Sequence, residues 1–433
     1  MSEWKRRTFV KALGLGVPLA VPAISRTILG ANDRISMALV GAGRRGSTVA
    51  GYFRDVGASQ RYVCDVFQPN LEKCLAEARS GSTGANNVKG CRDFREILDD
   101  KSVDTLLIAS PDHWHPYQTI EACKAGKDVY VEKPVAVTIP QVERMVTAAR
   151  EGNRIVQVGT QQRSGLHFQE AVDYVRSGKL GQVSAVHTIY YRNDSPKGIG
   201  YAADSTPPPG LDWDLWLGPA PKRPFNANRF GVRDGQWSSF RWFWDYAGGM
   251  LTDWGVHLLD IVLWAMGDVK GPQAAYATGG KFGLQDDRET PDTILATFKF
   301  PNWIATFENR LLNQATLHGE RKGIFFHGTR GTLYVNRQEY RIIAEDGKEI
   351  ARVAFKNDSG PDHVRNFLAC VRSRKKPIAD IGVHGPSTTV CLLGNVAYRA
   401  ETKVTWNPET STSSTPAAQE FLRVPERAPW TTA

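Results

Sequence analysis

The fold is decided by residues 35–46, which read ISMALVGAGRRG. A short, mostly apolar run of strand type leads directly into a G-x-G-x-x-G turn, and residues 47–53 have helical character. In such a strand–turn–helix unit, Gly41 allows the tight turn, Gly43 lets the backbone approach a pyrophosphate, and Gly46 lets the helix pack on the strand. The helix N-terminus offers unpaired N–H groups to phosphates. The stretch predicts a dinucleotide-binding site.

A second predicted strand, residues 61–64, ends at Asp65. Its distance from the glycine turn is close to the roughly 20 residues expected for the carboxylate that accepts a ribose hydrogen bond. Asp65 repels a 2′-phosphate, which favours NAD over NADP. Arg44 and Arg45 oppose that preference because a guanidinium can hold the extra phosphate, unless both are simply solvated loop residues. NAD is therefore the expected cofactor, with NADP as the alternative.

The N-terminal segment, residues 1–33, is set aside from the fold. Residues 5–11, KRRTFVK, resemble a twin-arginine export signal, and the apolar run after them is too short to span a bilayer. We expect the twin-arginine translocation machinery to export the folded protein to the periplasm, with a membrane tether if the signal is uncleaved. The alternative is a disordered basic tail. An exported enzyme meets little free NAD, so we expect a tightly bound cofactor.

Length and composition narrow the class of protein. A chain of 433 residues exceeds one hydrophobic core, so two domains are expected, and 41% hydrophobic with 23% charged residues is typical of a globular protein. The net charge of +9 comes partly from the export signal and the other bases are scattered, so no nucleic-acid partner is predicted. The six cysteines lack C-x-x-C spacing, which argues against a zinc or redox site.

Strands and helices alternate through residues 34–157. Predicted strands at 103–110, 128–131 and 155–158 are separated by helical segments, the pattern of a doubly wound parallel sheet. The strand that ends at Ser110 finishes in small residues, as a strand does where its carboxyl end faces a ligand. This region is the predicted Rossmann domain.

Two further motifs make the pattern specific. Pro111 and His115 follow the small-residue strand, and Glu132, Lys133 and Pro134 follow the next one. With the glycine turn, they resemble the Gfo/Idh/MocA family (glucose–fructose oxidoreductase, inositol dehydrogenase and their relatives). The resemblance implies an α/β fold whose Rossmann domain precedes an α+β domain with a large, mostly antiparallel sheet. It also implies a sugar or polyol oxidoreductase.

The predicted cofactor contacts combine the glycine turn with this resemblance. Pro134 biases Lys133 toward an extended conformation, which places the amine at the carboxyl end of a strand, where this fold binds ligands. The predicted cofactor-binding residues are Gly41, Gly43, Arg44, Arg45, Gly46, Asp65, Ser110, His115, Glu132, Lys133 and Gln161.

The second domain is expected over residues 158–402. It begins with a helix and a strand at 183–191, continues through a long loop at 193–224, and reads mainly as strands from 273 to 355. An antiparallel sheet of this size has a face that needs covering, so we expect a homodimer or homotetramer formed through it. Residues 403–433 are predicted to be an extended tail on the surface.

Asp253 and His257 are the predicted chemical centre of this domain. They fall at i and i+4 in a helical pattern, which predicts that carboxylate and imidazole meet on one face. By resemblance, Lys133, Asp253 and His257 are the catalytic positions. A simple helix ion pair is the structural alternative, and a metal site with Asp260 lacks a further ligand. The predicted substrate contacts are Arg163, Trp242 and Tyr246.

The predicted function is an exported NAD(P)-dependent oxidoreductase for a sugar, glycoside or polyol. His257 takes the hydroxyl proton, Lys133 stabilises the developing oxyanion, and Asp253 positions substrate and imidazole. The first alternative is a glycoside hydrolase that uses NAD transiently, through oxidation, elimination, water addition and re-reduction. The second is a sugar-binding sensor without catalysis.

Overall fold

Six parallel strands form the first sheet, in the order β3-β2-β1-β4-β5-β6. The strands are β1 (Ser36–Val40), β2 (Ser59–Cys64), β3 (Lys89–Cys91), β4 (Thr105–Ile108), β5 (Asp128–Val131) and β6 (Val156–Val158). β1 is buried along its whole length, as expected for a central strand covered on both faces. Strand order reverses between β1 and β4, and such a switch point opens a ligand crevice at the carboxyl ends. The predicted doubly wound fold is confirmed.

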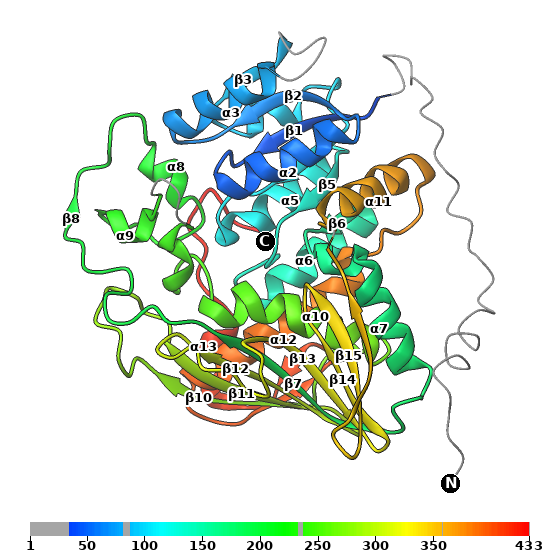
Figure 1. Ribbon diagram of the computed structural model, residues 1–433. Helices are drawn as coiled ribbons and strands as arrows, with labels where there is room; N and C mark the ends of the chain where they lie inside the picture. Colours follow the sequence, from blue (N-terminus) through cyan, green and yellow to red (C-terminus); the bar gives the residue numbers. More distant parts are fainter. Residues whose placement is uncertain (1–33, 81–86, 233–236, 357, 433) are drawn as a thin grey trace. The chain divides into compact units, whose positions relative to one another are not determined.

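The helices of this half alternate with the strands in the sequence and pack beside the sheet (Figure 1). They are α2 (Arg44–Asp55), α3 (Gln68–Ser80), α4 (Arg95–Leu98), α5 (His115–Lys124) and α6 (Ile139–Glu151). α6 begins with a capping box in which Thr138 and Gln141 satisfy each other's backbone N–H groups, so its start is readable in the sequence.

A ten-stranded sheet dominates the second half, in the order β16-β15-β14-β13-β7-β12-β11-β10-β17-β18. All neighbouring pairs are antiparallel except β7 and β12, which confirms the predicted mostly antiparallel sheet. The strands are β7 (Val183–Tyr191), β10 (Ala274–Gly280), β11 (Thr293–Lys299), β12 (Ile304–Arg310), β13 (Lys322–Gly328), β14 (Gly331–Val335), β15 (Glu339–Ala344), β16 (Glu349–Ala354), β17 (Val404–Asn407) and β18 (Thr412–Ser413).

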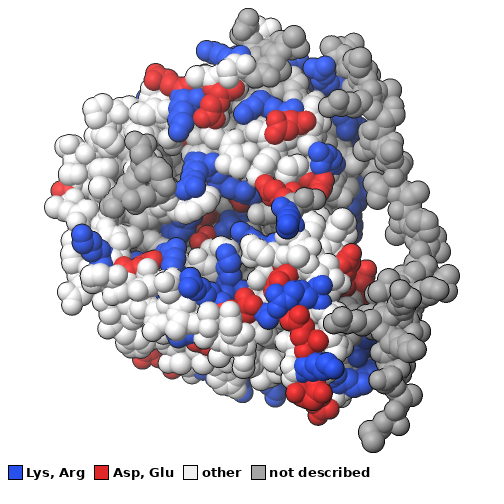
Figure 2. Space-filling view, in the orientation of Figure 1, with Lys and Arg blue, Asp and Glu red and all other residues white. Residues whose placement is uncertain are grey.

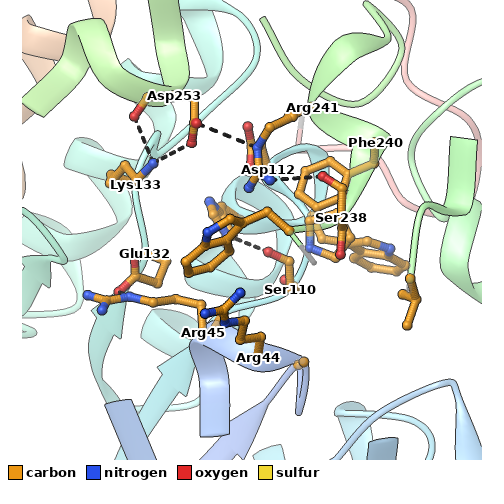
Figure 3. Close-up of a pocket in the computed structure, with 18 of the residues that line it drawn as sticks. Arg44, Arg45, Ser110, Asp112, Glu132, Lys133, Ser238, Phe240, Arg241 and Asp253 are labelled. Atoms are coloured by element: carbon orange, nitrogen blue, oxygen red, sulfur yellow. Dashed lines mark hydrogen bonds and ion pairs between the residues drawn. The ribbon is translucent and has the colours of Figure 1, made fainter. Parts of the chain in front are cut away.

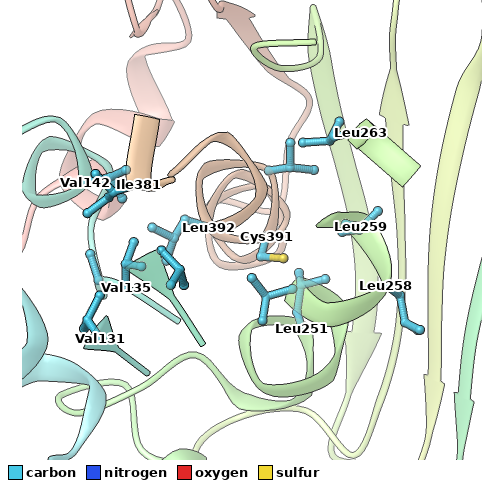
Figure 4. Packing of buried hydrophobic residues seen from close by; sticks show 14 of the residues in the cluster. Val131, Val135, Val142, Leu251, Leu258, Leu259, Leu263, Ile381, Cys391 and Leu392 are labelled. Atoms are coloured by element: carbon cyan, nitrogen blue, oxygen red, sulfur yellow. The ribbon is translucent and has the colours of Figure 1, made fainter. Parts of the chain in front are cut away.

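Helices join the two sheets into one core. α12 (Ile381–Arg399) packs against both α6 and α10 (Val256–Ala265). Figure 4 shows Cys391 and Leu392 of α12 between the Rossmann valines and the leucines of α10. The other helices here are α7 (Leu166–Arg176), α8 (Trp213–Leu217), α9 (Ala227–Phe230), α11 (Gly360–Ser373), α13 (Gln419–Leu422), and the short turns η3 (Asp112–Trp114), η4 (Gln161–Ser164), η5 (Ser239–Trp242), η6 (Leu251–Gly255) and η7 (Pro416–Ala418). Small strands β8 (Asp204–Ser205) and β9 (Phe225–Asn226) interrupt the long loop region.

The C-terminal part of the chain returns to the Rossmann domain, which the predicted domain limits missed. α11 packs on α2, and its Phe367 contacts Phe53 at 5.9 Å between ring centroids. Residues 403–433 are not simply a surface tail, because β17 joins the ten-stranded sheet and Trp430 is buried against Trp114. Aromatic burial at the chain end outweighs the polar, proline-containing composition that suggested a tail.

This computed structural model describes residues 34–80, 87–232, 237–356 and 358–432. The predicted export signal, residues 1–33, lies outside them. No described helix is both long and apolar enough to cross a membrane.

Candidate active site

A pocket of about 720 Å³ opens where the carboxyl ends of β1, β4 and β5 meet the turn η6 and helix α10. Lys and Arg side chains gather around a hollow in the middle of the face shown in Figure 2. Most predicted site residues line the pocket, namely Gly41, Gly43, Arg44, Arg45, Asp65, Ser110, His115, Glu132, Lys133, Gln161, Trp242, Asp253 and His257.

The glycine turn has the geometry a pyrophosphate needs. Gly41 has φ +89°, and a Cβ there would lie 2.5 Å from the Ser110 nitrogen. A Cβ on Gly46 would lie 1.9 Å from the Gly41 carbonyl oxygen, so only glycine lets α2 approach β1. At Gly43 nothing lies within 4 Å of such an atom, so the space above it is open. α2 has no side-chain N-cap and no acidic residue in its first turn, which leaves its N–H groups for an anion.

Asp65 is held beside this turn. Its carboxylate accepts hydrogen bonds from the backbone N–H of Ala42 at 2.7 Å and of Phe67 at 2.8 Å. Burial raises the pKa of Asp65 to about 6, although the Phe67 and Ala42 bonds act against this rise. Each carboxylate oxygen keeps lone-pair capacity for ribose hydroxyls. The turn and Asp65 therefore fit an NAD molecule.

The two arginines after Gly43 have different surroundings. Arg45 Nε donates to Glu132 Oε1 at 2.8 Å, so it bridges α2 and the end of β5 (Figure 3). The Arg44 guanidinium lies over the Trp237 ring, 4.5 Å from its centroid. Arg45 is therefore engaged with a carboxylate rather than solvated.

His115 forms hydrogen bonds with both motif loops, the one after β4 and the one after β5. Its ring nitrogens lie 2.7 Å from the Pro134 carbonyl and 2.8 Å from the Ser110 carbonyl. Burial lowers its pKa below the ordinary value, and the two carbonyls act against this. The ring is buried, so it fixes the loop that carries Lys133.

Lys133 and Asp253 meet in the pocket although they are far apart in the sequence (Figure 3). Lys133 Nζ donates to Asp253 Oδ1 at 2.7 Å and to the Asp253 carbonyl at 2.8 Å. Arg241 Nε lies 3.6 Å from Asp253 Oδ2. Burial opposes ionisation of Asp253, but Lys133 and Arg241 outweigh it and hold its pKa well below the ordinary value. The carboxylate is thus ionised at neutral pH.

His257 lines the same pocket but does not pair with Asp253, so the predicted i, i+4 contact is wrong. Residues 251–255 form a π-helical turn, which changes the relative directions of the two side chains. Asp253 turns to Lys133 instead, and the buried His257 Nδ1 has no hydrogen-bond partner. Burial, followed by the charges of Lys133 and Arg337, lowers the pKa of His257 well below its ordinary value. The imidazole is therefore neutral.

Two predicted substrate contacts are wrong. Arg163 is buried away from the pocket in an ion pair with Asp260, with Nη2 at 2.7 Å from Oδ1. Tyr246 is also buried outside the pocket lining, and its ring packs on Trp216 at 4.9 Å between centroids. Each lies near polar or aromatic segments in the sequence, but in the structure each side chain packs against a partner in the core. Trp242 does line the pocket.

The structure adds pocket residues that sequence reasoning missed: Asp112, Tyr190, Arg192, Arg241, Trp254 and Arg337. Asp112 had a signal, since it lies between Pro111 and His115. Burial raises the pKa of Asp112 to about 7, against the opposing charges of Lys133 and Arg241. The arginines come from separate loops and had no local signal. Within the described ranges, no group of three or more His, Cys, Asp or Glu side chains is placed to hold a metal ion.

Family models match both halves of the chain. Residues 35–160 match the Gfo/Idh/MocA model described as "Oxidoreductase family, NAD-binding Rossmann fold", and residues 196–432 match "Oxidoreductase family, C-terminal alpha/beta domain". Inositol 2-dehydrogenase of Salmonella typhimurium is 30% identical over 134 residues, which is 30% of this chain and 37% of that protein. Levoglucosan dehydrogenase of Pseudarthrobacter phenanthrenivorans is 24% identical over 294 residues, covering 63% of this chain and 66% of that one.

Solved structures share the fold. The WlbA dehydrogenase of Bordetella pertussis, in complex with NADH and UDP-GlcNAcA, superimposes with TM-score 0.62 at 20% identity and covers 86% of this chain and 99% of its own. Levoglucosan dehydrogenase with NADH and levoglucosan gives TM-score 0.63 at 16% identity, with 86% and 99% coverage. With both halves matched by its models, the chain belongs to the Gfo/Idh/MocA oxidoreductase family, with an NAD-binding Rossmann domain.

Proposed function

We propose that the protein is an NAD-dependent dehydrogenase of a sugar, glycoside or polyol secondary hydroxyl, with NADP as the less favoured cofactor. The observation that carries the proposal is the meeting of Lys133 Nζ with Asp253 at 2.7 Å, in a pocket that His257 also lines. The residue types are those needed to deprotonate an alcohol beside a nucleotide site. The names of inositol 2-dehydrogenase and levoglucosan dehydrogenase support this substrate class.

Lys133 binds and polarises the substrate oxygen. An ammonium group has three N–H donors, and two of them go to the Asp253 carboxylate and carbonyl. The third remains for a hydroxyl oxygen, whose developing negative charge the ammonium stabilises. Asp253 fixes the amine in place through these two hydrogen bonds.

His257 takes the proton. Its pKa lies well below the ordinary value, so the ring is an unprotonated acceptor at neutral pH. The nearby Lys133 charge favours an alkoxide over an imidazolium, so the proton must pass onward to solvent. When bound, NAD supplies the hydride acceptor, and the glycine turn, Asp65 and Glu132 are the residues that would hold it.

The proposal is tested by purifying the protein without added nucleotide and recording the absorbance band of reduced nicotinamide. Incubation with a panel of sugars, polyols and glycosides should produce net reduced nicotinamide together with a ketone. Absence of both with every panel member, in NAD-saturated protein, would contradict the proposal.

A glycoside hydrolase that oxidises its substrate transiently is the second candidate, and Asp112 is the observation that favours it. Elimination of an aglycone needs a base for a ring C–H, and a buried pocket carboxyl with a pKa of about 7 is suited to that role. This candidate predicts released aglycone with no net change in nicotinamide absorbance. An Asp112→Asn variant would then keep ketone formation but lose aglycone release.

We also propose export and self-association. The sequence of residues 5–11 supports transport by the twin-arginine route, with the cofactor held tightly afterwards. Cell fractionation of wild type and an Arg6→Lys, Arg7→Lys variant tests it, and a wild type that stays in the cytoplasm contradicts it.

Tyr276, Leu295 and Ile304 are 41%, 44% and 40% exposed on neighbouring strands of the large sheet, which supports a homo-oligomer. Light scattering measures its size, and a monomer at all concentrations contradicts this part.

A further inference from the structure

Arg337 lies in the turn between β14 and β15 and lines the pocket. Its Nε donates to Gln162 Oε1 at 3.0 Å, and its guanidinium lies over the Trp254 ring, 4.5 Å from the centroid. Gln162 in turn donates to the His257 carbonyl at 3.1 Å. The guanidinium is thus anchored on two sides to the segment that carries Asp253 and His257.

Among the described residues this cation has no ion-pair partner. Arg337 forms no ion pair with any residue the structure describes, and its two Nη amines have no hydrogen-bond partner there. By contrast, four other basic side chains of the pocket, Arg45, Lys133, Arg192 and Arg241, each have a carboxylate partner. Burial, followed by the charge of Arg45, lowers the pKa of Arg337, and the more distant charge of Asp253 only partly opposes this.

A second cation lies on the same indole. Lys322 Nζ is 5.6 Å from the centroid of the Trp254 ring and has no ion pair within the described parts of the chain. Burial, followed by the charge of Arg337, lowers the pKa of Lys322. Trp254 is therefore flanked by two basic groups that repel each other, and an anion between them and the pocket would relieve that repulsion.

The net charge of the pocket indicates the charge of the anion that Arg337 would bind. Its described lining holds eight Lys and Arg against five Asp and Glu, an excess of three positive charges. The pyrophosphate of a bound dinucleotide compensates two of these, and the oxidised nicotinamide ring adds one positive charge. At least one positive charge therefore remains for the substrate to compensate, and the planar fork of an arginine matches a carboxylate.

We propose that the substrate is an acidic sugar, a uronic acid or uronide, whose carboxylate binds the Nη amines of Arg337. This inference rests on the proposed dehydrogenase function and adds the substrate class. The carboxylate would lie beside the η6 turn, so the sugar ring presents a hydroxyl to Lys133 and His257. Lys322 adds long-range attraction, while Arg337 supplies the directional contact.

The experiment compares methyl uronides with the matching uronamides, which replace the carboxylate by a neutral group of the same shape. Glucuronides and galacturonides are both used with NAD-loaded full-length protein. Binding is measured by calorimetry and oxidation by reduced-nicotinamide absorbance. We expect the acid to be preferred roughly 10- to 100-fold, the range for a hydrogen-bonded charge. Equal or better binding of the uronamides would overturn the proposal.

Variants test whether Arg337 causes the preference for the acid over the amide. Arg337→Gln should bring the acid-to-amide ratio close to one, Arg337→Lys should keep part of it, and the exposed Arg365→Gln on α11 should keep all of it. Thermal unfolding checks that each variant is folded. An acid-to-amide ratio that is unchanged in Arg337→Gln would contradict the assignment of the carboxylate site to Arg337. If no sugar is oxidised at all, the dehydrogenase function fails, while the calorimetric ratio still decides whether the acid site exists.

Discussion

Two clusters built around one continuous helical segment each contain a carboxylate, a basic side chain and a histidine. In the first, Asp253 binds Lys133 beside His257, and the pocket reaches all three side chains. In the second, seven residues further along, Asp260 accepts hydrogen bonds from Arg163 at 2.7 Å, His384 at 2.9 Å and Ser387 at 3.0 Å. We refer to them as the open cluster (Lys133, Asp253, His257) and the closed cluster (Arg163, Asp260, His384, Ser387).

The difference lies in what is left for a ligand. In the closed cluster the Asp260 carboxylate is fully buried and shared among three protein donors, so the arrangement holds elements together. In the open cluster Lys133 keeps one N–H and the pocket reaches His257, whereas it does not reach His384, although each imidazole has one buried nitrogen without a partner among the described residues. A carboxylate, a cation and a histidine can thus act on a ligand only where a pocket reaches them.

The largest effect is expected from Lys133→Met in the open cluster. It removes the only amine of that cluster, so kcat/KM for sugar oxidation should fall by roughly 1000-fold, the size of a lost oxyanion donor. The free energy of unfolding should change little, because Asp253 retains Arg241. Steady-state kinetics and urea unfolding of the same preparation measure both. A loss of stability that parallels the loss of rate would show the open cluster to be structural.

The opposite pattern is expected from Arg163→Met in the closed cluster. It leaves the Asp260 carboxylate buried and short of its main counter-charge, which should lower the free energy of unfolding by about 3–5 kcal/mol. The kcat/KM of the folded protein should stay within a few-fold of wild type. Arg365→Gln is the control for losing a surface arginine, with a change within about 0.5 kcal/mol. A stable Arg163→Met variant with altered substrate preference would restore Arg163 to the substrate site.

Two buried histidines outside both clusters should each make the protein less stable in acid. Burial lowers the pKa of His113 and of His363 to about 4, against 6.5 for an ordinary histidine. Below pH 6.5 the unfolded chain takes up protons that the folded chain refuses until about pH 4. The free energy of unfolding should therefore fall by about 1.4 kcal/mol per pH unit for each group in that window, and stay flat from this source above it. Asp65 and Asp112, whose pKa values burial raises to about 6 and about 7, act in the opposite sense in this window, so the histidine contribution is measured as the difference in slope between wild type and His363→Gln in urea titrations at several pH values. Equal slopes in the two proteins would contradict it.

The smallest effect is expected from Ser387→Ala, which trims one donor from the closed cluster. The loss of its 3.0 Å bond to Asp260 should lower the free energy of unfolding by about 1 kcal/mol. Unchanged kcat/KM and an unchanged pH–rate profile would sharpen the division between the clusters. A shifted pH–rate profile would instead indicate that the closed cluster passes protons to His257.

Local pattern was enough to predict the glycine turn, the parallel sheet and the joint presence of Lys133, Asp253 and His257 in one site. It failed where a partner is distant in the sequence. Arg163 was assigned to substrate because its partner Asp260 lies 97 positions away, and nothing near either residue announces the pairing. Arg337 could not be predicted for a similar reason, because its contacts are also distant in the sequence. It reaches the pocket only because the ten-stranded sheet places the β14–β15 turn near η6.

The contact between Asp253 and His257 was mispredicted for a different reason. A regular α-helix puts i and i+4 side chains on one face, but the π-turn at residues 251–255 breaks that rule where the pocket begins. Such turns have no reliable sequence signature. The prediction for the end of the chain also fails, because its polar composition conceals buried residues such as Trp406, Leu422 and Trp430.

The central claim is that redox chemistry occurs at the open cluster and nowhere else. It is tested most directly by mixing NAD-loaded protein with a perdeuterated sugar substrate, quenching within the first turnover, and weighing the nucleotide by mass spectrometry. The account predicts deuterium on the nicotinamide for wild type and for Arg163→Met, and none for Lys133→Met. Unlabelled nucleotide in the wild type, or equal labelling in Lys133→Met, would contradict it.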